Sequence, residues 1–302
     1  MQMSVSVVMP AKNAAPYIRE AIESVFAQAS GVRELIIVDD GSTDDTVSLV
    51  RALGDSRIRL LANDASGVSA ARNLGARTAT GHWLMFLDAD DRLRPGAVAT
   101  LIAAAKAAPR AIVVYGDYDR IDGEGRPIGR RSLLKRRRKP SGQVLERLAA
   151  GNFIVNGGVM IIRREAFAAA GGFDESLKYC EDWHCWCRLA AVGEFQFIPA
   201  LLLDYRVHAT NTMSAELRSP RDFFPAVERV FGDRLILGKL PAESTPRLRK
   251  AAEVHLLTYA AAQAIRFRRY REAFCYLRMV GRRSLLSTPR AVMSLSLAYV
   301  GI

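Results

Sequence analysis

The sequence lacks several features that would assign it to a class at once. No run of about 18 uncharged apolar residues occurs in it, so we expect no transmembrane helix. The N-terminus has no basic stretch followed by an apolar one, and we therefore expect no signal peptide. Four cysteines in 302 residues are too few for a disulfide scaffold, which favours reduced thiols and a cytoplasmic location.

The common glycine-rich loops that hold nucleotides are also missing. No G-x-x-x-x-G-K-[ST] pattern occurs, which excludes a P-loop. No G-x-G-x-x-G pattern follows the first predicted strand, which argues against a nicotinamide or flavin dinucleotide. Any nucleotide must therefore be held in another way, by carboxylates together with a metal ion.

The charge of the chain is large but unevenly distributed. The 43 Lys and Arg against 31 Asp and Glu give a formal net charge of +12. The excess lies in residues 126–139, which contain no acidic residue, and in residues 215–302. The stretch 126–139 also contains no aromatic residue that could stack on a base, so we do not expect nucleic acid as a partner. A loop that contacts a diphosphate or an anionic lipid-linked acceptor fits better, and a merely solvated loop is the alternative.

Short apolar strands alternate with helical segments through the first part of the chain. The five predicted strands are Val5–Met9, Leu35–Val38, Ile58–Leu61, Trp83–Leu87 and Ile112–Tyr115. We expect Asn13 to cap the helix after the first strand, and Ser42 or Thr43 to cap the next one. This order predicts an α/β fold with a mainly parallel sheet flanked by helices, whose ligands bind beyond the carboxyl ends of the strands.

Two acidic clusters directly follow strands of this predicted sheet. Asp39 and Asp40 follow the second strand, and Asp88, Asp90 and Asp91 follow the fourth. Each cluster alone could be a turn with a helix cap. Together they indicate a site, because converging carboxylates repel one another unless a cation or a hydrogen-bonding ligand joins them. Mg²⁺ and Mn²⁺ take oxygen ligands and bridge to diphosphate oxygens, so we expect one of them as the cofactor.

Several motifs in a fixed order make the chain resemble the family-2 glycosyltransferases of the GT-A fold. They are VSVVMPAKN from Val5, ELIIVDDGSTDDT from Glu34, GVSAARNLG from Gly67, FLDADD from Phe86, GGFDE from Gly171, EDW from Glu181 and YRVH from Tyr205. The resemblance covers about residues 4–214. It implies a catalytic domain at residues 1–214, with a nucleotide-binding half at 1–125, the basic loop at 126–139 and an acceptor half at 140–214.

For the donor, the resemblance implies a wall that holds the nucleotide base. Residues that match this wall are Pro10, Ala11, Asn13, Asp39 and Asp40. Asp40 would accept a hydrogen bond from a base N–H, and Asp39 would support it.

The resemblance also identifies Asp88-Ala89-Asp90 as the D-x-D motif of the family. Asp90 would ligate the Mn²⁺ or Mg²⁺ ion that bridges the diphosphate. Asp88 would reach the ribose or the metal shell, and Asp91 would support both.

Three more side chains are candidates for the same site, and two of them have an alternative interpretation. His208 would join the metal shell or close over the diphosphate, or else be a structural, hydrogen-bonded histidine. Arg206 is a candidate partner of the diphosphate, because guanidinium pairs well with phosphate oxygens. Arg72 would lie near the nucleotide, or else form an ion pair on a helix surface.

Glu181 and Asp182 match the acidic pair that supplies the catalytic base in the family. We assign Asp182 as the base and Glu181 as its neighbour or as a contact to the acceptor. The alternative is that the pair caps the following helix, since acids favour helix N-termini, and both roles are compatible.

The residues around this acidic pair also invite a zinc hypothesis. Its candidate ligands are Cys180, His184, Cys185 and Cys187. No second C-x-x-C pair exists, so we favour buried thiols that pack with the neighbouring tryptophans.

Residues 215–302 are predicted to form a helical, basic C-terminal region. Apolar residues at helical spacing from Leu256 to Val280 alternate with a series of arginines. Such a region can lie peripherally on the anionic inner face of the cell membrane. It can equally fold onto the catalytic domain as a cap.

The resemblance implies an enzyme. It would be a metal-dependent glycosyltransferase that moves a sugar from a nucleotide-diphosphate sugar, UDP-sugar favoured, to a hydroxyl of a carbohydrate or lipid-linked acceptor. Inversion and a role in cell-surface polysaccharide or glycolipid synthesis are implied in the same way. A sugar nucleotidyltransferase is one alternative, although it usually carries a glycine-rich basic loop where this chain has residues 10–13. A catalytically inactive basic scaffold for membrane or nucleic acid is the other, although it needs neither acidic set.

Overall fold

The computed structural model describes residues 3–128, 139–154, 156–209 and 217–283. Most of the basic loop predicted at 126–139, and the domain boundary that we placed at residue 214, lie outside the described residues.

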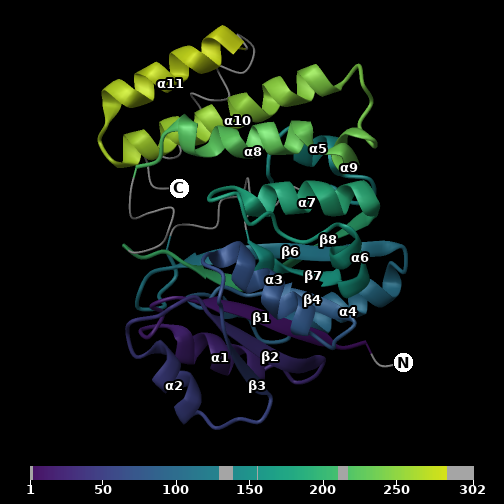
Figure 1. Cartoon of the computed structure of the whole chain (residues 1–302), viewed down its shortest axis with the longest axis vertical. Helices are drawn as coiled ribbons and strands as arrows, with labels where there is room; N and C mark the ends of the chain where they lie inside the picture. Colours follow the sequence, from purple (N-terminus) through teal and green to yellow (C-terminus); the bar gives the residue numbers. More distant parts are fainter. Residues whose placement is uncertain (1–2, 129–138, 155, 210–216, 284–302) are drawn as a thin grey trace.

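The strands form one sheet of eight strands in the order β3-β2-β1-β4-β7-β6-β8-β5 (Figure 1). They are β1 (Val5–Ala11), β2 (Val32–Asp39), β3 (Ile58–Ala62), β4 (Trp83–Phe86), β5 (Arg92–Leu93), β6 (Ala111–Ile121), β7 (Met160–Arg163) and β8 (Glu194–Arg206). Strands β1 to β4 pair in parallel, as do β6 and β8, whereas β7 and β5 run antiparallel to their neighbours. The predicted α/β fold with a mainly parallel sheet is confirmed.

Helices cover the sheet and extend away from it in layers (Figure 1). Those of the first two thirds are α1 (Ile18–Phe26), α2 (Thr46–Ala52), α3 (Val68–Thr78), α4 (Ala97–Ala107), α5 (Leu145–Ala149), α6 (Arg164–Ala169) and α7 (Glu181–Val192). The helical C-terminal region contains α8 (Pro220–Gly232), α9 (Arg234–Leu237), α10 (Thr245–Arg266) and α11 (Tyr270–Arg283). Figure 1 shows α7 next to the sheet, α8 and α10 beyond it, and α11 outermost.

Both helix caps that we predicted are wrong. Helix α1 begins only at Ile18, while Asn13 has a φ of 50° and its side chain accepts a hydrogen bond from the Thr43 N–H at 2.8 Å. Helix α2 begins at Thr46, and the Ser42 hydroxyl instead accepts from the Asn13 N–H at 3.0 Å. The side chains thus join the loop after β1 to the loop after β2. Local helix rules cannot reveal this role, because the two loops are far apart in sequence.

Helix α3 lies close to β1 because residue 75 has no side chain. A Cβ atom on Gly75 would come within 2.3 Å of Val8 Cγ1, so a larger residue would push the helix away from the sheet. Arg72 lies one turn before this glycine on the same helix. The close approach therefore sets how far Arg72 reaches over the ends of the strands.

One apolar core continues from the sheet into the C-terminal helices. Buried Phe223 and Val227 of α8 and Leu248 and Leu256 of α10 belong to the same cluster as Trp183 of α7. Helices α8 and α10 therefore fold onto the part of the protein that contains the sheet, as one of our two interpretations of this region proposed. No helix within the described part of the chain is both long and apolar enough to cross a membrane.

Candidate active site

The two acidic clusters lie beyond the carboxyl ends of neighbouring parallel strands, as predicted. β1 pairs with β2 up to the register of Ala11 and Asp39, and with β4 up to that of Val8 and Phe86. The backbone then continues the contact, because the Asp40 N–H donates to the Ala11 carbonyl at 2.8 Å. The loops after β1, β2 and β4 are consequently neighbours.

Asp91 is the innermost carboxylate of the cluster that follows β4. Its side chain is buried, with 1% of the residue exposed. The carboxylate accepts hydrogen bonds from the Arg206 N–H at 2.8 Å and from Asn156 Nδ2 at 2.6 Å. Burial raises its pKa well above the ordinary value, and the charges of Asp90 and Asp88 add to this effect. Asn156 Nδ2 also lies 3.3 Å from Asp88, so Asp91 and Asp88 share this partner.

Asp90 meets His208 at the rim of the same loop. Asp90 Oδ2 lies 3.0 Å from His208 Nε2, and the His208 ring stacks against Tyr17 with 4.6 Å between ring centroids. A carboxylate oxygen and an imidazole nitrogen are both ligands of divalent cations such as Mn²⁺. The donor set therefore fits a metal ion with two protein ligands. Within the described residues, no group of three or more His, Cys, Asp or Glu side chains could hold a metal ion by itself.

Asp88 faces away from this pair. One of its oxygens accepts from Arg72 at 2.8 Å and the other from Asn156 Nδ2 at 3.3 Å. Ala89 between the two aspartates is buried, which leaves the chain no room for a larger side chain there. The D-x-D sequence thus points its two carboxylates at different partners.

Arg72 connects the two acidic sets of the site. Its second nitrogen donates to Glu181 Oε1 at 2.9 Å, so one guanidinium joins the loop after β4 to the start of α7. The side chain is only 12% exposed, which excludes the surface ion pair that we had considered. Burial alone would lower the pKa of Arg72, but the adjacent Asp88 and Glu181 carboxylates raise it, and Arg72 stays charged.

Asp182 lies beside Glu181 in the first turn of α7, where the helix dipole favours acids. It accepts from Asn152 Nδ2 at 3.2 Å and from the Trp183 N–H at 2.6 Å. Burial raises its pKa to about 7, and the charge of Glu181 contributes in the same direction. The pair occupies the first turn of α7 and not the N-cap, which is Cys180, so the predicted cap is wrong although the position at the helix N-terminus is as expected. Asp182 also has the pKa of a general base that works at neutral pH.

The side chains that we expect around the nucleotide base lie at the ends of β1 and β2 and in the loops after them. Asp40 Oδ1 accepts from Asn63 Nδ2 at 2.6 Å and from the Gly67 N–H at 2.9 Å, and Lys12 lies 3.5 Å from the other oxygen. Asp39 accepts from the Ser42 N–H at 3.2 Å. Together with Pro10, Ala11 and Asn13, they form one connected pair of loops.

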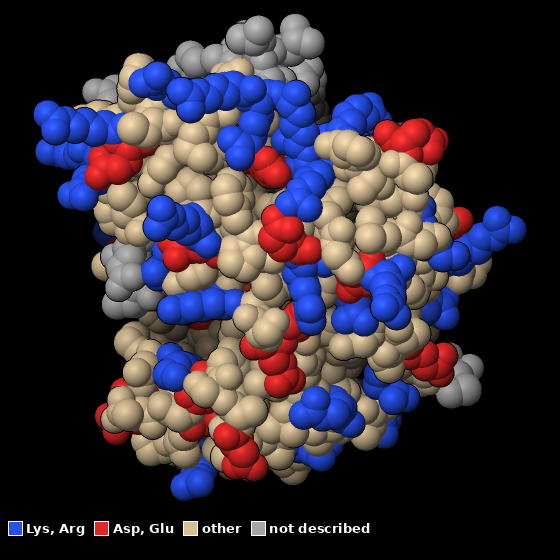
Figure 2. Space-filling view, turned by 45° about the horizontal axis from the view of Figure 1, so that its top comes forward, with Lys and Arg blue, Asp and Glu red and all other residues tan. Residues whose placement is uncertain are grey.

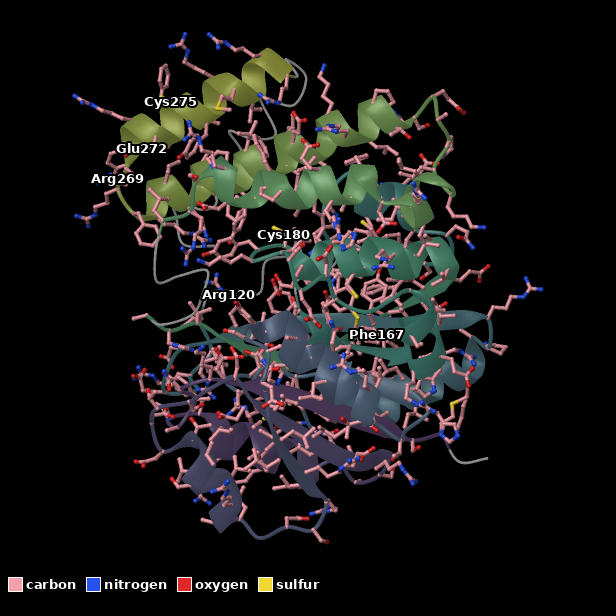
Figure 3. The ribbon with its side chains drawn as sticks, viewed as in Figure 1. Arg120, Phe167, Cys180, Arg269, Glu272 and Cys275 are labelled. Carbon is pink, nitrogen blue, oxygen red and sulfur yellow. The ribbon has the colours of Figure 1, made fainter. Side chains whose placement is uncertain are left out.

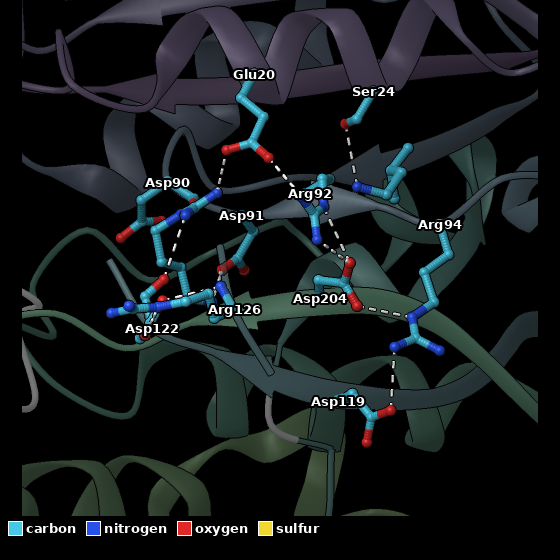
Figure 4. Close-up of polar contacts among 12 residues, drawn as sticks. Glu20, Ser24, Asp90, Asp91, Arg92, Arg94, Asp119, Asp122, Arg126 and Asp204 are labelled. Carbon is cyan, nitrogen blue, oxygen red and sulfur yellow. Dashed lines mark hydrogen bonds and ion pairs between the residues drawn. The ribbon is translucent and has the colours of Figure 1, made fainter. Parts of the chain in front are cut away.

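Arg206 lies deeper than our expectation of a diphosphate partner requires. It is 1% exposed, and its guanidinium donates to the carbonyls of Asp90 and Gly123 at 2.8 and 3.0 Å and also to Glu20. Glu20 in turn pairs with Arg92 (Figure 4). These contacts of Arg206 hold the backbone of the loop after β4 in place. They favour a positioning role over direct contact with phosphate.

The cysteines of α7 are buried in the core, and its histidine forms a hydrogen bond within the protein. Cys185 and Cys187 are buried, and burial raises the pKa of both thiols. His184 Nε2 lies 3.0 Å from Asp233 Oδ2, at the start of α9. Figure 3 shows Cys180 at the start of α7.

Sequence reasoning missed three residues that hold the site together. Asn152 donates to the proposed base, Asn63 holds Asp40, and Glu20 of α1 pairs with both Arg206 and Arg92. Glu20 and Arg206 are 186 positions apart, so no local pattern could have linked them.

The structure is similar to solved glycosyltransferases. TarS 1-349 of S. aureus in complex with UDP-GlcNAc is 17% identical, with 99% of this chain and 88% of that chain covered at a TM-score of 0.69. The mannosyltransferase PcManGT from Pyrobaculum calidifontis, in complex with GDP-Man and Mn²⁺, is 22% identical over 97% and 81% of the two chains, at a TM-score of 0.61. These similarities show a GT-A fold.

Sequence comparisons give the family. The succinoglycan biosynthesis protein ExoO of Rhizobium meliloti is 41% identical over 125 residues, which are 41% of this chain and 36% of that protein. The model of the family described as glycosyl transferase family 2 matches residues 6–171. Because this match spans more than half of the 302 residues, the chain belongs to glycosyltransferase family 2.

Proposed function

We propose that the protein transfers a sugar from a nucleotide-diphosphate sugar to an acceptor hydroxyl, with a divalent metal ion and with inversion at the anomeric carbon. The observation that carries this proposal is the bridge made by Arg72. Its two nitrogens lie 2.8 Å from Asp88 and 2.9 Å from Glu181. A donor bound at the loop after β4 and a base at the start of α7 would therefore act on the same sugar.

The donor side is assigned to the loops after β1, β2 and β4. Asp39, Asp40 and the segment 10–13 would line the base, and Asp88 would reach the ribose. Asp90 and His208, whose side chains are 3.0 Å apart, would hold Mn²⁺ or Mg²⁺. Such an ion neutralises charge that develops on a leaving diphosphate.

The acceptor side is assigned to the start of α7. As the acceptor oxygen forms its bond to the anomeric carbon, the bond from that carbon to the diphosphate oxygen breaks, and the nucleoside diphosphate leaves with its electron pair. The acceptor hydroxyl gives its proton to the Asp182 carboxylate. Asn152 orients this carboxylate through its 3.2 Å hydrogen bond, and Arg72 holds the neighbouring Glu181 at 2.9 Å.

The named relatives support the choice of substrates. TarS is described with UDP-GlcNAc and PcManGT with GDP-Man and Mn²⁺, and ExoO is named for succinoglycan biosynthesis. We therefore favour a UDP-sugar donor, a carbohydrate or lipid-linked acceptor, and a role in cell-surface polysaccharide or glycolipid synthesis. We place the protein in the cytoplasm, peripherally on the inner face of the cell membrane.

Thermal unfolding with a panel of ligands tests the donor proposal. UDP, GDP and their sugars are each added with Mn²⁺, with Mg²⁺ and with a chelator, and the melting temperature is recorded. A ligand that binds only the folded state raises this temperature by mass action. We expect the largest rise with one nucleotide family and only in the presence of metal. No metal-dependent rise with any member of the panel would contradict the proposal.

A further inference from the structure

The connection between α10 and α11 exposes an unusual run of side chains. All six residues of the segment Arg-Phe-Arg-Arg-Tyr-Arg, at positions 266–271, are exposed. Tyr270 and Phe274 are 56% and 63% exposed, the highest values among the exposed large hydrophobic residues of the described chain. Large aromatic rings in water are costly, so such a concentration indicates a contact surface. We call residues 266–271 with Phe274 and Arg278 the α11 surface.

The opposite side of α11 is firmly attached to the protein. Ala273 and Val280 are buried, and Val280 packs with Leu257 of α10. Arg283 forms an ion pair with Glu253 of α10 at 2.6 Å. The α11 surface therefore faces outward because the helix is fixed by its other side. Figure 1 shows α11 as the outermost layer of the molecule.

The charge of this region is almost entirely positive. Residues 266–283 contain seven arginines, and Glu272 is their one acidic residue. Glu272 pairs with Arg269 at 3.0 Å, whereas Arg266, Arg268 and Arg271 have no ion-pair partner among the described residues. Figure 2 shows Lys and Arg side chains gathered over the part of the molecule that contains α10 and α11.

We propose that the α11 surface binds an anionic lipid membrane. Arginines are attracted to lipid headgroups that carry negative charge, and aromatic rings insert at the boundary between headgroups and acyl chains. The surface lies on an outward-facing helix and its adjoining turn, which suits a flat bilayer better than a partner that must enter a groove. Membrane attachment is part of the proposed function, on which this proposal rests. The α11 surface is the part of the chain that we assign to that attachment.

The fold connects this surface to the proposed base. Helix α10 ends at Arg266, and earlier in the same helix His255 covers Gly151, where an added Cβ would come within 2.8 Å of the imidazole. The next residue, Asn152, donates to Asp182. Figure 3 shows Arg269 at the left end of α11, and Cys180, which precedes the acidic pair, nearer the middle of the view. Membrane contact would thus hold the acceptor side of the site near a lipid-linked substrate.

Vesicle flotation tests the surface directly. The full chain is floated with vesicles of phosphatidylglycerol and phosphatidylcholine, and with vesicles of phosphatidylcholine alone. We expect recovery with the anionic vesicles only. The substitutions Arg266→Gln, Arg268→Gln and Arg271→Gln together should lower partitioning on the order of 100-fold, because each basic residue near an anionic surface contributes roughly fivefold. Replacing Phe267, Tyr270 and Phe274 with Ser should also release the protein.

A matched control removes the same charge elsewhere. Arg19, Arg51 and Arg77 are exposed on α1, α2 and α3, far from α11 in sequence, and their change to Gln should leave flotation as in the unchanged protein. An equal loss in the control would overturn the proposal, because total charge would then be the cause. So would the absence of flotation with anionic vesicles. Binding of single-stranded RNA through the same arginines, without vesicle binding, would assign the surface to nucleic acid instead.

A fluorescence measurement tests binding to vesicles independently of flotation. Cys275 is the one exposed cysteine of the four, and it lies on α11 next to Phe274. A polarity-sensitive fluorophore on Cys275 should shift to the blue with anionic vesicles, and an unchanged spectrum would contradict the proposal. Neither measurement needs donor, metal or turnover. An inactive Asp182→Asn protein that still floats would therefore separate failure of the catalytic proposal from failure of this one.

Discussion

The two acidic sets of the site differ in how deeply their carboxylates are buried and in which groups hold them. In the loop after β4, Asp91 is 1% exposed and accepts from Arg206 and Asn156 at 2.8 and 2.6 Å. At the start of α7, Asp182 is only half-buried and accepts from Asn152 at 3.2 Å and from the adjacent Trp183 N–H at 2.6 Å. Burial raises the pKa of both groups, and that of Asp182 to about 7.

This difference shows that a raised pKa alone does not identify a base. Asp91 is 1% exposed and enclosed by Arg206 of β8 and by Asn156, so a substrate cannot reach its carboxyl group. Asp182 combines a pKa shift in the same direction with access from outside, which proton transfer requires. The same physical cause, burial, thus produces a structural carboxyl in one region and a candidate base in the other.

The largest effect is expected from Asp182→Asn. The amide cannot accept the proton of the acceptor hydroxyl, and general bases contribute about 10²- to 10⁴-fold, so transfer should fall by this factor. Donor binding should stay unchanged, because Asp182 lies on the acceptor side. The measurement is kcat for sugar transfer together with the thermal shift by donor and metal.

Asp55→Asn is the matched control for this change. Asp55 pairs with Arg57 on the surface, far from the site, and its loss should leave transfer unaffected. Transfer near the level of the unchanged protein in Asp182→Asn would remove the base assignment. Asp182 would then be a structural carboxyl, as Asp91 is.

The next largest effect is expected from Asp90→Asn. This change removes one of two proposed metal ligands but leaves Asp182 and the start of α7 intact. The metal-dependent rise in melting temperature with the donor should be lost, whereas unfolding without ligand should change little. His208→Ala should reproduce this loss. A full metal-dependent rise in both variants would contradict the ligand assignment.

The sequence predicted the strands better than the contacts within the site. Apolar strands followed by acids located Asp39, Asp40, Asp88 and Asp90 at one sheet edge, because strand period and strand ends are local properties. The partners of these acids were not predictable in this way. Arg72 and Glu181 are 109 positions apart, and the buried setting of Arg206 depends on α1 and on β8. Only the packed fold brings such pairs together.

A smaller effect is expected when Arg72 is changed. The positive charge of Arg72 lowers the pKa of Asp182, opposing the burial and Glu181 that raise it. In the unchanged protein kcat/KM should rise with pH to a plateau above about 7, since the base must lose its proton. In Arg72→Met the rise should move to higher pH, with a severalfold lower rate at neutral pH. Arg72→Lys should restore part of the profile. A profile of unchanged position in Arg72→Met would show that Arg72 does not act on the base.

The smallest effect concerns the stability of the folded state. Asp182 has a folded pKa of about 7, above its unfolded value, so the folded protein binds more protons between the two values. Its contribution to the free energy of unfolding should therefore decline as pH rises through this window and stay level above it. His184 and His255, whose pKa values burial lowers, act in the opposite direction, so the comparison must be made against a variant. Urea unfolding of Asp182→Asn should show a shallower decline than the unchanged protein, whereas Asp55→Asn should run parallel to it. Parallel curves for Asp182→Asn would mean that the carboxyl is not held in its protonated form by burial.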